Sequence, residues 1–526
     1  NSRRPKVTAL TVDGRRYPVR YKVINANSLR IDTQDTARIK LTVIPGPDPE
    51  DGWWYKFGQH ATRIAMSVRN FSFTYKNTYA MTLPGFRPEV GDMFGQKKHG
   101  GFLAPGMDFA FGFTGDGYID RALQNDWLIC NDSVVSPASS NALEDLQLRI
   151  SLEPIRDLKI DLTANRTRNR SREIQYMFEG MPDTRSGNFS MSIISIGSAF
   201  ERPSAGDGYH SGTFERFRRN LDVIRDRVES QFLGAQYPQG STLAGKTFDP
   251  ANGTISKHSP DVMIPAFLAA YTGKSARNSA LDFFPSLFSM MPNWRITYTG
   301  LTKIAWFKKN FRSVNLNHAY RSTYSVGSYN TFQSFMSYMG DIGFVEDVQS
   351  GNPIPSSRFD ISMVSINEQF SPLIGMDATL KNGLTAKVEY KTSRILNLSM
   401  SACQLVETAS RDFIIGLGYK IVNFNLFSGR NVKDSKNRVS HDLALRADIS
   451  FRNQSALCRD IQQGFAQATN GNKALKISCS ADYTLSRLLT LRLYYDRQQN
   501  TPLVSSSSYP VVSADFGFSM KFSLTR

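Results

Sequence analysis

The sequence predicts an all-β fold: a large antiparallel transmembrane β-barrel, of which this chain forms part, with a few short helices in extramembrane or lumenal loops. Three observations predict it. Apolar and polar residues alternate along many segments, several of these segments have ten or more residues, and the longest apolar run is only 263–271. A strand places successive side chains on opposite faces, whereas a membrane-spanning helix needs roughly 20 apolar residues.

The alternating segments are organised as hairpins. Apolar residues occupy the even positions of 146–152 and of 158–164, with polar residues between them. The same pattern fills 374–380 and 384–390 on either side of an Asn-Gly turn. Asn-Gly is the strongest short hairpin signal, because both residues tolerate positive φ. Further alternating segments are 443–452, 475–483, 489–495 and 512–525.

Alternation by itself fits two architectures. In a soluble sandwich the apolar face is the core, whereas in a membrane barrel it contacts lipid and the polar face lines a lumen. Strand length favours the barrel, because spanning strands have about 9–11 residues and sandwich strands average about 5–6. Tight turns at 154–157, 381–383 and 485–488 also alternate with connections of about twenty residues at 391–411 and 453–473, as expected for short periplasmic turns and long extracellular loops.

Two segments are predicted to be helical. Apolar residues spaced three and four apart fill 214–232, with Thr213 as the N-cap and Gly234 beyond the end. The second helix, 260–271, has Pro260 at its first position and is too short to cross a membrane. We expect the first helix to pack on the protein's own loops; covering a pore or docking a partner is the alternative. The chain then divides into an N-terminal segment (1–60), barrel strands with long loops (61–205), a helix-containing insertion (206–291) and C-terminal barrel strands (292–526).

Composition and motifs argue against several other classes of protein. Lys and Arg outnumber Asp and Glu by 63 to 46, but the basic residues are interleaved with acidic ones, which argues against a nucleic-acid partner. The six histidines are scattered and no Gly-x-Ser-x-Gly elbow is present, so we expect no catalytic residue, metal site or cofactor. Residues 240–247 match the P-loop pattern, but no buried strand precedes them, and Pro250 and Gly253 stop a helix from following. Because a phosphate site needs that strand and helix, we expect an ordinary loop.

The four cysteines, Cys130, Cys403, Cys458 and Cys479, show no metal-ligand spacing. Cys458 and Cys479 flank one connection, and the sequence fits a disulfide between them in an oxidising compartment no better than two independent buried thiols. The spacing therefore excludes a zinc site and a dense disulfide framework, and leaves this one pairing open.

The polar faces of the strands carry the candidate functional residues. In a barrel these faces line the lumen. A wall of mixed sign suits a wide, water-filled passage that ions and polypeptides traverse without sticking, rather than a selectivity ring of one sign. The alternative is that the charges simply pair across strands. The candidate lumen-facing residues are Arg149, Lys159, Asp161, Asp377, Lys387, Glu389, Arg446, Asp448, Arg452, Lys476, Asp482, Arg492, Asp496 and Lys521.

Several stretches of the chain resemble the SprA/Sov family, the outer-membrane translocon of the Bacteroidota type IX secretion system. Among them are Ala-Pro-Gly-Met-Asp-Phe-Ala-Phe-Gly from position 104, Pro-Asn-Trp-Arg-Ile-Thr-Tyr from position 292 and Phe-Ile-Ile-Gly-Leu-Gly-Tyr from position 413. The similarity is collinear, covers about residues 60–526 and includes loops that have no periodicity. The other matching stretches are 144–149, 157–166, 259–273, 369–377 and 384–391.

The resemblance implies a very large single-chain barrel, to which this chain contributes the C-terminal portion. It implies export of folded cargo proteins with type IX secretion signals across the outer membrane of a Gram-negative bacterium of the Bacteroidota, and gliding motility in some relatives. The implied partners are the remainder of the same giant chain, a plug protein, a PorV-like barrel shuttle protein at a lateral gate, and outer-membrane lipid and lipopolysaccharide. The family has no catalytic residues to carry over. A stand-alone porin or outer-membrane transporter and a soluble surface β adhesin are the alternatives.

Overall fold

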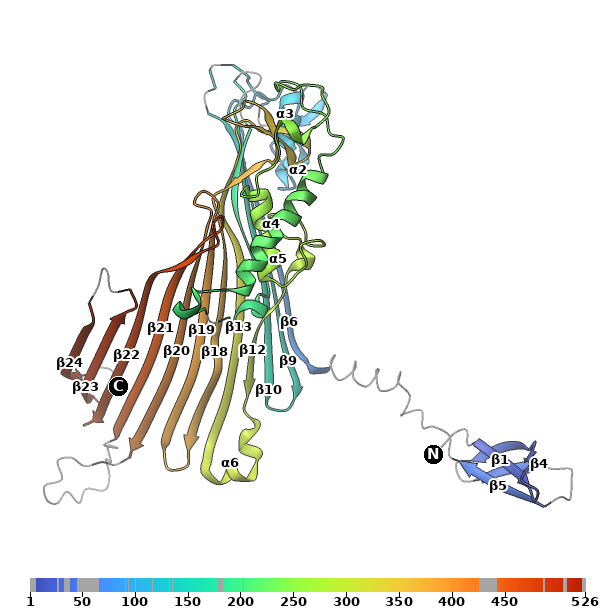
Figure 1. Ribbon diagram of the computed structural model, residues 1–526, viewed down its shortest axis with the longest axis vertical. Helices are drawn as coiled ribbons and strands as arrows, with labels where there is room; N and C mark the ends of the chain where they lie inside the picture. The colour runs from blue at the N-terminus through green and yellow to red at the C-terminus, as the bar shows by residue number, and fades with distance from the viewer. Residues whose placement is uncertain are drawn as a thin grey trace. The chain divides into compact units, whose positions relative to one another are not determined.

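Figure 1 shows the protein as a computed structural model with two compact units, residues 1–69 with 152–156 and residues 70–151 with 157–526. Within the described residues, no helix is long and apolar enough to cross a membrane. The structure describes residues 6–25, 28–32, 38–44, 66–89, 91–92, 94–99, 101–115, 117–131, 133–134, 136–177, 183–201, 203–422, 424, 442–485, 488–504 and 509–522.

The first unit contains two small antiparallel sheets. β1 (Lys6–Thr11) pairs with β2 (Arg16–Tyr17) and with β5 (Ile39–Ile44). β3 (Arg20–Asn25) pairs with β4 (Ser28–Asp32). Both sheets lie in the predicted N-terminal segment, whose last residues, 45–60, are outside the described part of the chain.

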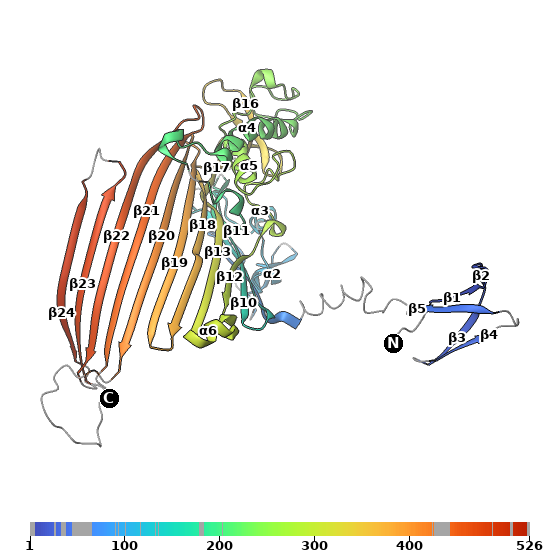
Figure 2. The same ribbon diagram turned by 60° about the horizontal axis from the view of Figure 1, so that its bottom comes forward.

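The second unit is built on a 14-stranded antiparallel sheet, which confirms the predicted all-β fold class with a large antiparallel sheet. The strand order is β24-β23-β22-β21-β20-β19-β18-β13-β11-β10-β9-β6, with β12 beside β10 and β13 and with β17 beside β13. Figure 2 shows the long strands side by side, with the helices α4 and α5 gathered at one end. The strands are β6 (Val68–Thr82), β9 (Ala138–Ile155), β10 (Leu158–Ile174), β11 (Asp183–Ser192), β12 (Asn293–Tyr298), β13 (Phe311–Thr331), β17 (Phe359–Ile361), β18 (Met363–Leu380), β19 (Leu384–Ser399), β20 (Gln404–Ile421), β21 (Leu443–Asp460), β22 (Ala466–Thr484), β23 (Leu489–Pro502) and β24 (Val511–Phe522).

The predicted hairpins are confirmed, and their strands are longer than expected. β9 and β10 meet at 156–157 and β18 and β19 at 381–383. β22 pairs with β23 as far as Thr484 with Thr490, whereas 486–487 of the predicted turn 485–488 lie outside the described residues. The first of these turns is shorter than the predicted 154–157, because β9 continues through Pro154 to Ile155.

The long connections predicted at 391–411 and 453–473 are wrong. β19 runs on to Ser399 before β20 begins, and β21 runs on to Asp460, so that short links at 400–403 and 461–465 join these strands. The alternation of apolar and polar residues stops before the strands do, which made their outer halves look like loops.

A segment of about a hundred residues between β11 and β12, residues 193–292, contains the two predicted helices; we name it the cover segment. α4 (Gly212–Ser230) corresponds to the predicted 214–232, and α5 is Pro260–Tyr271 as predicted. The predicted N-cap Thr213 is wrong. Ser211 Oγ accepts a 3.1 Å hydrogen bond from the Phe214 amide, and Thr213 lies in the first turn. The segment's 3-10 turns are η2 (Ile196–Ser198), η3 (Ala205–Asp207), η4 (Pro250–Asn252) and η5 (Leu287–Ser289).

The cover segment shares one hydrophobic core with the sheet. α5 is apolar on nearly all sides and is buried accordingly, with Met263 and Phe267 fully enclosed. α4 contributes an apolar stripe that includes Phe217 and Ile224, and this core continues into the buried strand residues of β11, β13, β18 and β19. α4 thus packs on the protein as predicted, but against α5 and the sheet and not only on loops.

The remaining elements are small. α3 (Tyr118–Gln124) supplies Tyr118 and Ile119 to a second core, together with Trp127 and Leu128. The other short elements are β7 (Lys97–His99), β8 (Phe102–Ala104), α2 (Met107–Ala110), η6 (Gly300–Lys303), α6 (Ala305–Asn310), and a three-stranded sheet of β14 (Met336–Met339), β15 (Ile342–Glu346) and β16 (Pro353–Ser357).

Candidate functional site

The strand register brings the candidate lumen-facing residues of β18–β24 onto one face of the sheet. Directly opposed residues of an antiparallel pair share a face. Asp377 pairs with Lys387, Lys387 with Gly416 and Gly416 with Asp448. The same row continues through Ser478 to Asp496. On β24 the row continues at Asp515, which pairs with Asp496. Residues an even number of positions from a member of this row share its face, and the other candidates that do so are Glu389, Arg446, Arg452, Lys476, Asp482, Arg492 and Lys521.

The candidates on β9 and β10 lie on the same face. Lys159 pairs with Thr297, Thr297 with Asn317, and Asn317 with Gly375, which is two residues before Asp377. Asp161 follows two residues after Lys159 and accepts a 2.5 Å hydrogen bond from the Ser151 hydroxyl of β9. Arg149 is two residues before Ser151. All fourteen candidates therefore share one face, with eight basic and six acidic side chains.

Part of this polar face is held together by ion pairs between and along strands. Arg452 donates from Nε and Nη2 to the two carboxylate oxygens of Asp412, each at 3.0 Å. Lys387 and Lys391 both contact the carboxylate of Glu389, at 3.1 and 2.9 Å. The alternative that the charges pair across strands is thus correct for part of the set. Two further pairs are Lys159 with Asp161 (3.2 Å) and Arg492 with Asp482 (3.6 Å).

Among the other candidates, Arg446, Asp448 and Asp496 border hollows in this face. Within the described residues, Arg446, Asp448 and Asp496 form no ion pair, and the same holds for Lys476 and Lys521. A depression of about 500 Å³ runs beside Asp448 and Arg446, where β20 has glycine at 416 and 418. A Cβ at position 416 would lie 2.5 Å from Asp448 Oδ1, so glycine leaves room for that carboxylate.

The opposite face of β19–β24 is apolar over a limited height and is exposed. Leu417, Phe451 and Phe516 are 48%, 50% and 71% exposed on this face. Large side chains of this kind are exposed in a contiguous patch only where a membrane or a partner covers them. We name this surface the apolar band; its members are Leu384, Ala386, Val388, Tyr390, Phe413, Ile415, Leu417, Tyr419, Leu445, Ala447, Ile449, Phe451, Leu475, Ile477, Cys479, Ala481, Leu491, Leu493, Tyr495, Phe516, Phe518 and Met520.

The apolar band ends sharply along rows of paired residues. On β19–β22 its last row joins Tyr390, Phe413, Phe451 and Leu475. On β23 the band ends sooner, because Ile477 pairs with Arg497 and Leu475 with Gln499. The next row on the same face is polar: it joins Thr392, Arg411, Asn453 and Lys473. Counted from Leu443, which lies on the same face two residues before the band's Leu445, to Phe451, the apolar side of β21 is nine residues long, close to the length that a tilted strand needs to cross a bilayer.

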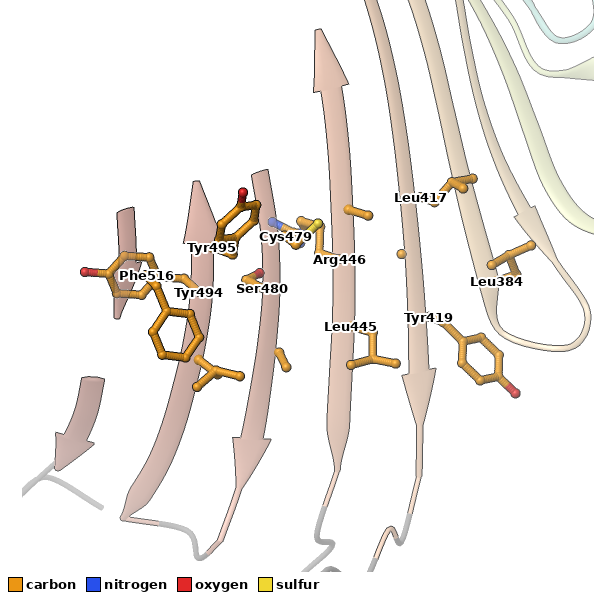
Figure 3. A pocket seen from close by; sticks show the side chains of 14 residues that line it. Leu384, Leu417, Tyr419, Leu445, Arg446, Cys479, Ser480, Tyr494, Tyr495 and Phe516 are labelled. Atoms are coloured by element: carbon orange, nitrogen blue, oxygen red, sulfur yellow. The ribbon is translucent and has the colours of Figure 1, made fainter. Parts of the chain in front are cut away.

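The band has a shallow depression of about 350 Å³, shown in Figure 3. It lies along the row that joins Leu417, Ala447, Cys479, Tyr495 and Phe516. The two small side chains in the middle of the row, between larger ones on either side, create the hollow. The depression is lined mainly by apolar atoms.

Beyond the polar row, the same face of the sheet is covered by the cover segment. Leu396 and Leu398 of β19 and Leu405 of β20 are completely buried there, in the core that contains α4 and α5. In β19 these leucines lie an even number of residues from Tyr390 and so continue the face of the apolar band. One face of the sheet is thus exposed and apolar along one half and covered by protein along the other.

A buried polar network fixes the cover segment to the sheet. Glu368 of β18, 1% exposed, accepts hydrogen bonds from Arg394 Nη2 (2.6 Å), Tyr320 Oη (2.7 Å) and Ser195 Oγ (2.7 Å). Arg394 also donates to the carbonyl of Ser198 (2.6 Å), which links the ion pair of the sheet to the cover segment by a direct hydrogen bond. In a second buried pair, Arg459 with Glu407, Nη1 of Arg459 donates to the Tyr209 carbonyl at 2.6 Å.

A carboxylate organises the start of α4. Glu201 accepts hydrogen bonds from Ser211 Oγ, the Thr213 amide and Thr213 Oγ1, at 2.5, 3.0 and 2.5 Å. Burial raises the pKa of Glu201, but these hydrogen bonds outweigh burial and leave the pKa below its usual value. A negative charge at a helix N-terminus is favourable, so Glu201 stabilises α4 where the cover segment begins.

The other sequence motifs are not brought together into a site. Residues 240–246 form turns and bends, and only the short 3-10 turn η4 follows them before α5, which confirms that the P-loop match is a loop. The disulfide between Cys458 and Cys479 is wrong: both thiols are free. Cys479 pairs with Ala447, eleven residues from Cys458 along β21, which is about 36 Å at roughly 3.3 Å per residue. A disulfide requires Cα atoms within about 7 Å. No metal-binding group of His, Cys, Asp or Glu occurs among the described residues.

Sequence reasoning missed the network around Glu368 and Arg394. A signal was present, because both residues occupy positions at which the alternation of β18 and β19 calls for apolar side chains. A charge on the apolar side of two neighbouring strands indicates that protein, rather than lipid, covers them there.

Comparisons with known proteins add little to this geometry. No family model and no curated protein matches the chain. Among solved structures it is similar to the β-domain of the Bordetella autotransporter BrkA, at 6% identity over 74% of this chain and 92% of that chain, with a TM-score of 0.21. It is also similar to in-vitro folded OmpT, an outer membrane protein of Vibrio cholerae, at 9% identity over 86% of this chain and 96% of that chain, with a TM-score of 0.19. At this level of similarity, the function has to be judged from the chain's own two faces.

Proposed function

We propose that the chain forms part of a large transmembrane β-barrel of the outer membrane, with its charged face lining a water-filled passage and its apolar band facing lipid. The observation that carries this proposal is the change between adjacent rows on one face, from Tyr390, Phe413 and Phe451 to Thr392, Arg411 and Asn453. In a soluble protein, an apolar sheet face is buried by other parts of the protein. An apolar face that stays exposed and ends at a polar row is instead suited to contact with a bilayer.

The open edges of the sheet favour a portion of a larger barrel over a self-contained porin. β24 and β6 end the strand order, and neither is paired with the other. Each backbone group left unpaired in hydrocarbon costs several kcal/mol, so spanning sheets are closed. Closure here requires further strands against β24 and β6, and the remainder of a giant chain is the source that the resemblance to the SprA/Sov family supplies.

The finer proposal is the protein-conducting translocon of the type IX secretion system. Its support is the resemblance of residues 60–526 to the SprA/Sov family, together with a polar wall of both signs. A wall without a dominant sign does not retain a polypeptide of either charge. On this proposal the lumen conducts folded cargo with type IX secretion signals, and a plug protein and a PorV-like shuttle protein at a lateral gate control it. The chain itself acts as a passive conduit and not as an enzyme.

The proposal also assigns the two ends of the strands. The short turns at 156–157 and 381–383 lie at one end, where β12 also leads to β13 through 299–310 and β20 to β21 through 422–442. The cover segment, by far the largest connection at about a hundred residues, lies at the other end, together with the short links 400–403 and 461–465. Outer-membrane barrels have short periplasmic turns and larger extracellular connections. The cover segment then lies outside the cell, above the lipid-facing band.

The apparent mass of the native polypeptide tests the translocon proposal. Outer-membrane extracts of a Bacteroidota species that encodes this chain are run on denaturing gels and probed with antiserum against residues 206–291. A band several times the 59.0 kDa of this chain supports a giant translocon. A band at that mass overturns the translocon in favour of a porin, and recovery of the protein in the aqueous phase without detergent overturns the barrel in favour of an adhesin.

A further inference from the structure

The connection between β12 and β13 carries an exposed aromatic cluster. Trp306 of α6 lies against Phe307 and Phe311, with ring centroids 4.9 and 5.8 Å away, and the two phenylalanine rings are 5.6 Å apart. Trp306 remains 61% exposed and the neighbouring Ile304 52% exposed. Aromatic rings that pack against one another and remain exposed leave apolar surface that a further partner can bury.

A bulge directs this cluster to the side of the apolar band. Phe311 pairs with Leu380 and Ser313 with Thr379, so β13 has one extra residue between them. Leu380 lies on the apolar side of β18, two residues from Ala378. Without the extra residue Phe311 would point to the charged face. The aromatic cluster therefore continues the apolar side of the sheet at the end where the turns 156–157 and 381–383 lie.

The same connection is strongly basic. Residues 299–312 contain Lys303, Lys308, Lys309 and Arg312 and no acidic residue. Lys303 forms an ion pair with Asp157 in the adjacent turn, and the exposed side chains of Lys308 and Lys309 follow directly after the aromatic pair. The Asn310 carbonyl accepts a 3.2 Å hydrogen bond from the Lys381 amide, so a further basic residue borders the connection.

We propose that residues 299–312 are an interfacial anchor that inserts Trp306 and Phe307 at the headgroup level of the periplasmic leaflet and binds its anionic phospholipids through Lys308, Lys309 and Arg312. This inference rests on the proposed membrane barrel, because it uses the apolar band as the lipid-facing surface. Two observations select lipid as the occupant: the cluster is continuous with the band, and its charge complements anionic headgroups. Trp at the interface with Lys beside it is the combination that such boundaries favour.

Quenching of Trp306 by brominated lipid tests the anchor. The native protein is extracted from outer membranes and reconstituted in vesicles whose phosphatidylcholine carries bromine either near the headgroup or near the bilayer centre. The difference in emission between the wild type and Trp306→Phe isolates this residue from the other tryptophans. We expect bromine near the headgroup to remove most of the Trp306 emission and bromine near the centre to remove much less. Quenching by neither lipid, or mainly from the centre, overturns the proposal.

The charge part of the anchor has its own test and control. In vesicles with phosphatidylglycerol, the double variant Lys308→Glu/Lys309→Glu should lose the additional quenching that the anionic lipid produces in the wild type. The matched double variant Lys246→Glu/Lys274→Glu, on the cover segment, should keep it. Equal behaviour of the two double variants overturns the role of the lysines.

A second tryptophan separates this inference from the barrel itself. Leu445→Trp in the Trp306→Phe background places the probe within the apolar band. Quenching of that probe from the bilayer centre, with Trp306 unquenched, rejects the anchor and retains the barrel. If neither probe is quenched by any brominated lipid, the proposed barrel is rejected as well.

Discussion

Removing the charge of Glu368 should release the cover segment from the sheet. Glu368→Gln keeps the shape of the side chain but replaces the carboxylate, 2.6 Å from Arg394, with a neutral amide, so the charge of Arg394, whose side chain is 9% exposed, is left uncompensated. Breaking a buried ion pair from one side costs about 3–5 kcal/mol. At about 1.4 kcal/mol per tenfold change, the undocked form should rise by a factor of roughly 100 to several thousand.

Limited proteolysis measures this population. Cleavage within 193–292 under native conditions follows the fraction of open molecules when closing is faster than cleavage. Asp482→Asn is the matched control, because its partner Arg492 is 3.6 Å away and both side chains are well exposed. An exposed pair contributes about 0–1 kcal/mol, so this variant should be cleaved at nearly the wild-type rate.

A double variant strengthens the test. Glu368→Leu/Arg394→Met leaves neither charge buried, and it should regain at least part of the resistance that Glu368→Gln loses, because replacing both partners of a buried pair is often neutral. The reasoning is refuted if Glu368→Gln is cleaved as slowly as the wild type. It is also refuted if the double variant is cleaved faster than the single one.

Three further predictions concern other parts of the molecule. Glu201→Ala should destabilise the start of α4 by about 1–3 kcal/mol, measured as faster amide exchange in α4. Because folding lowers the pKa of Glu201, its stabilising contribution is fully present above the unfolded pKa. The exchange rates of the wild type should therefore approach those of the variant as the pH falls through the folded pKa. Ile449→Arg on the apolar band should cost about 2–4 kcal/mol and reduce assembled protein in the outer membrane, whereas Ser450→Arg on the charged face should not; equal levels of the two would contradict the assignment of faces. Lys246→Ala should leave thermal stability unchanged with or without ATP, and an ATP-dependent rise in wild-type Tm that the variant loses would show that the loop binds nucleotide.

The face of each strand could be predicted from the sequence because the strand period is two. Asp377, Lys387 and Asp448 were assigned to one side by alternation alone, and the register confirms that they form one row. Hairpin pairs such as β18 and β19 followed from the Asn-Gly turn, since a tight turn fixes which residues are opposed.

What covers an apolar face could not be predicted in the same way. Val388 lies in the exposed band and Leu396 lies beneath the cover segment, yet both are aliphatic residues at even positions of β19. Alternation shows that a face is apolar, but it does not show whether lipid or protein covers that face. The strand ends were misjudged for a related reason: Thr392 and Arg394 interrupt the pattern on the apolar side while the backbone pairing continues.

The bulge before Ser313 could not be predicted from the sequence pattern either. One extra residue moves Phe311 to the other face, and nothing in the local sequence states which strand of a pair contains the insertion. The aromatic cluster at α6 therefore emerged only from the register.

In a lipid-embedded barrel the two faces of β21 meet different surroundings, water on the charged face and lipid on the apolar band. A variant without Cys130, Cys403, Cys458 and Cys479 is given single cysteines at positions 444–451 and treated in intact outer membranes with a water-soluble maleimide. We predict labelling at 444, 446, 448 and 450, on the charged face, and protection at 445, 447, 449 and 451, on the apolar band. Equal labelling at all eight positions, or the opposite alternation, would contradict a barrel with a charged lumen and a lipid-facing band.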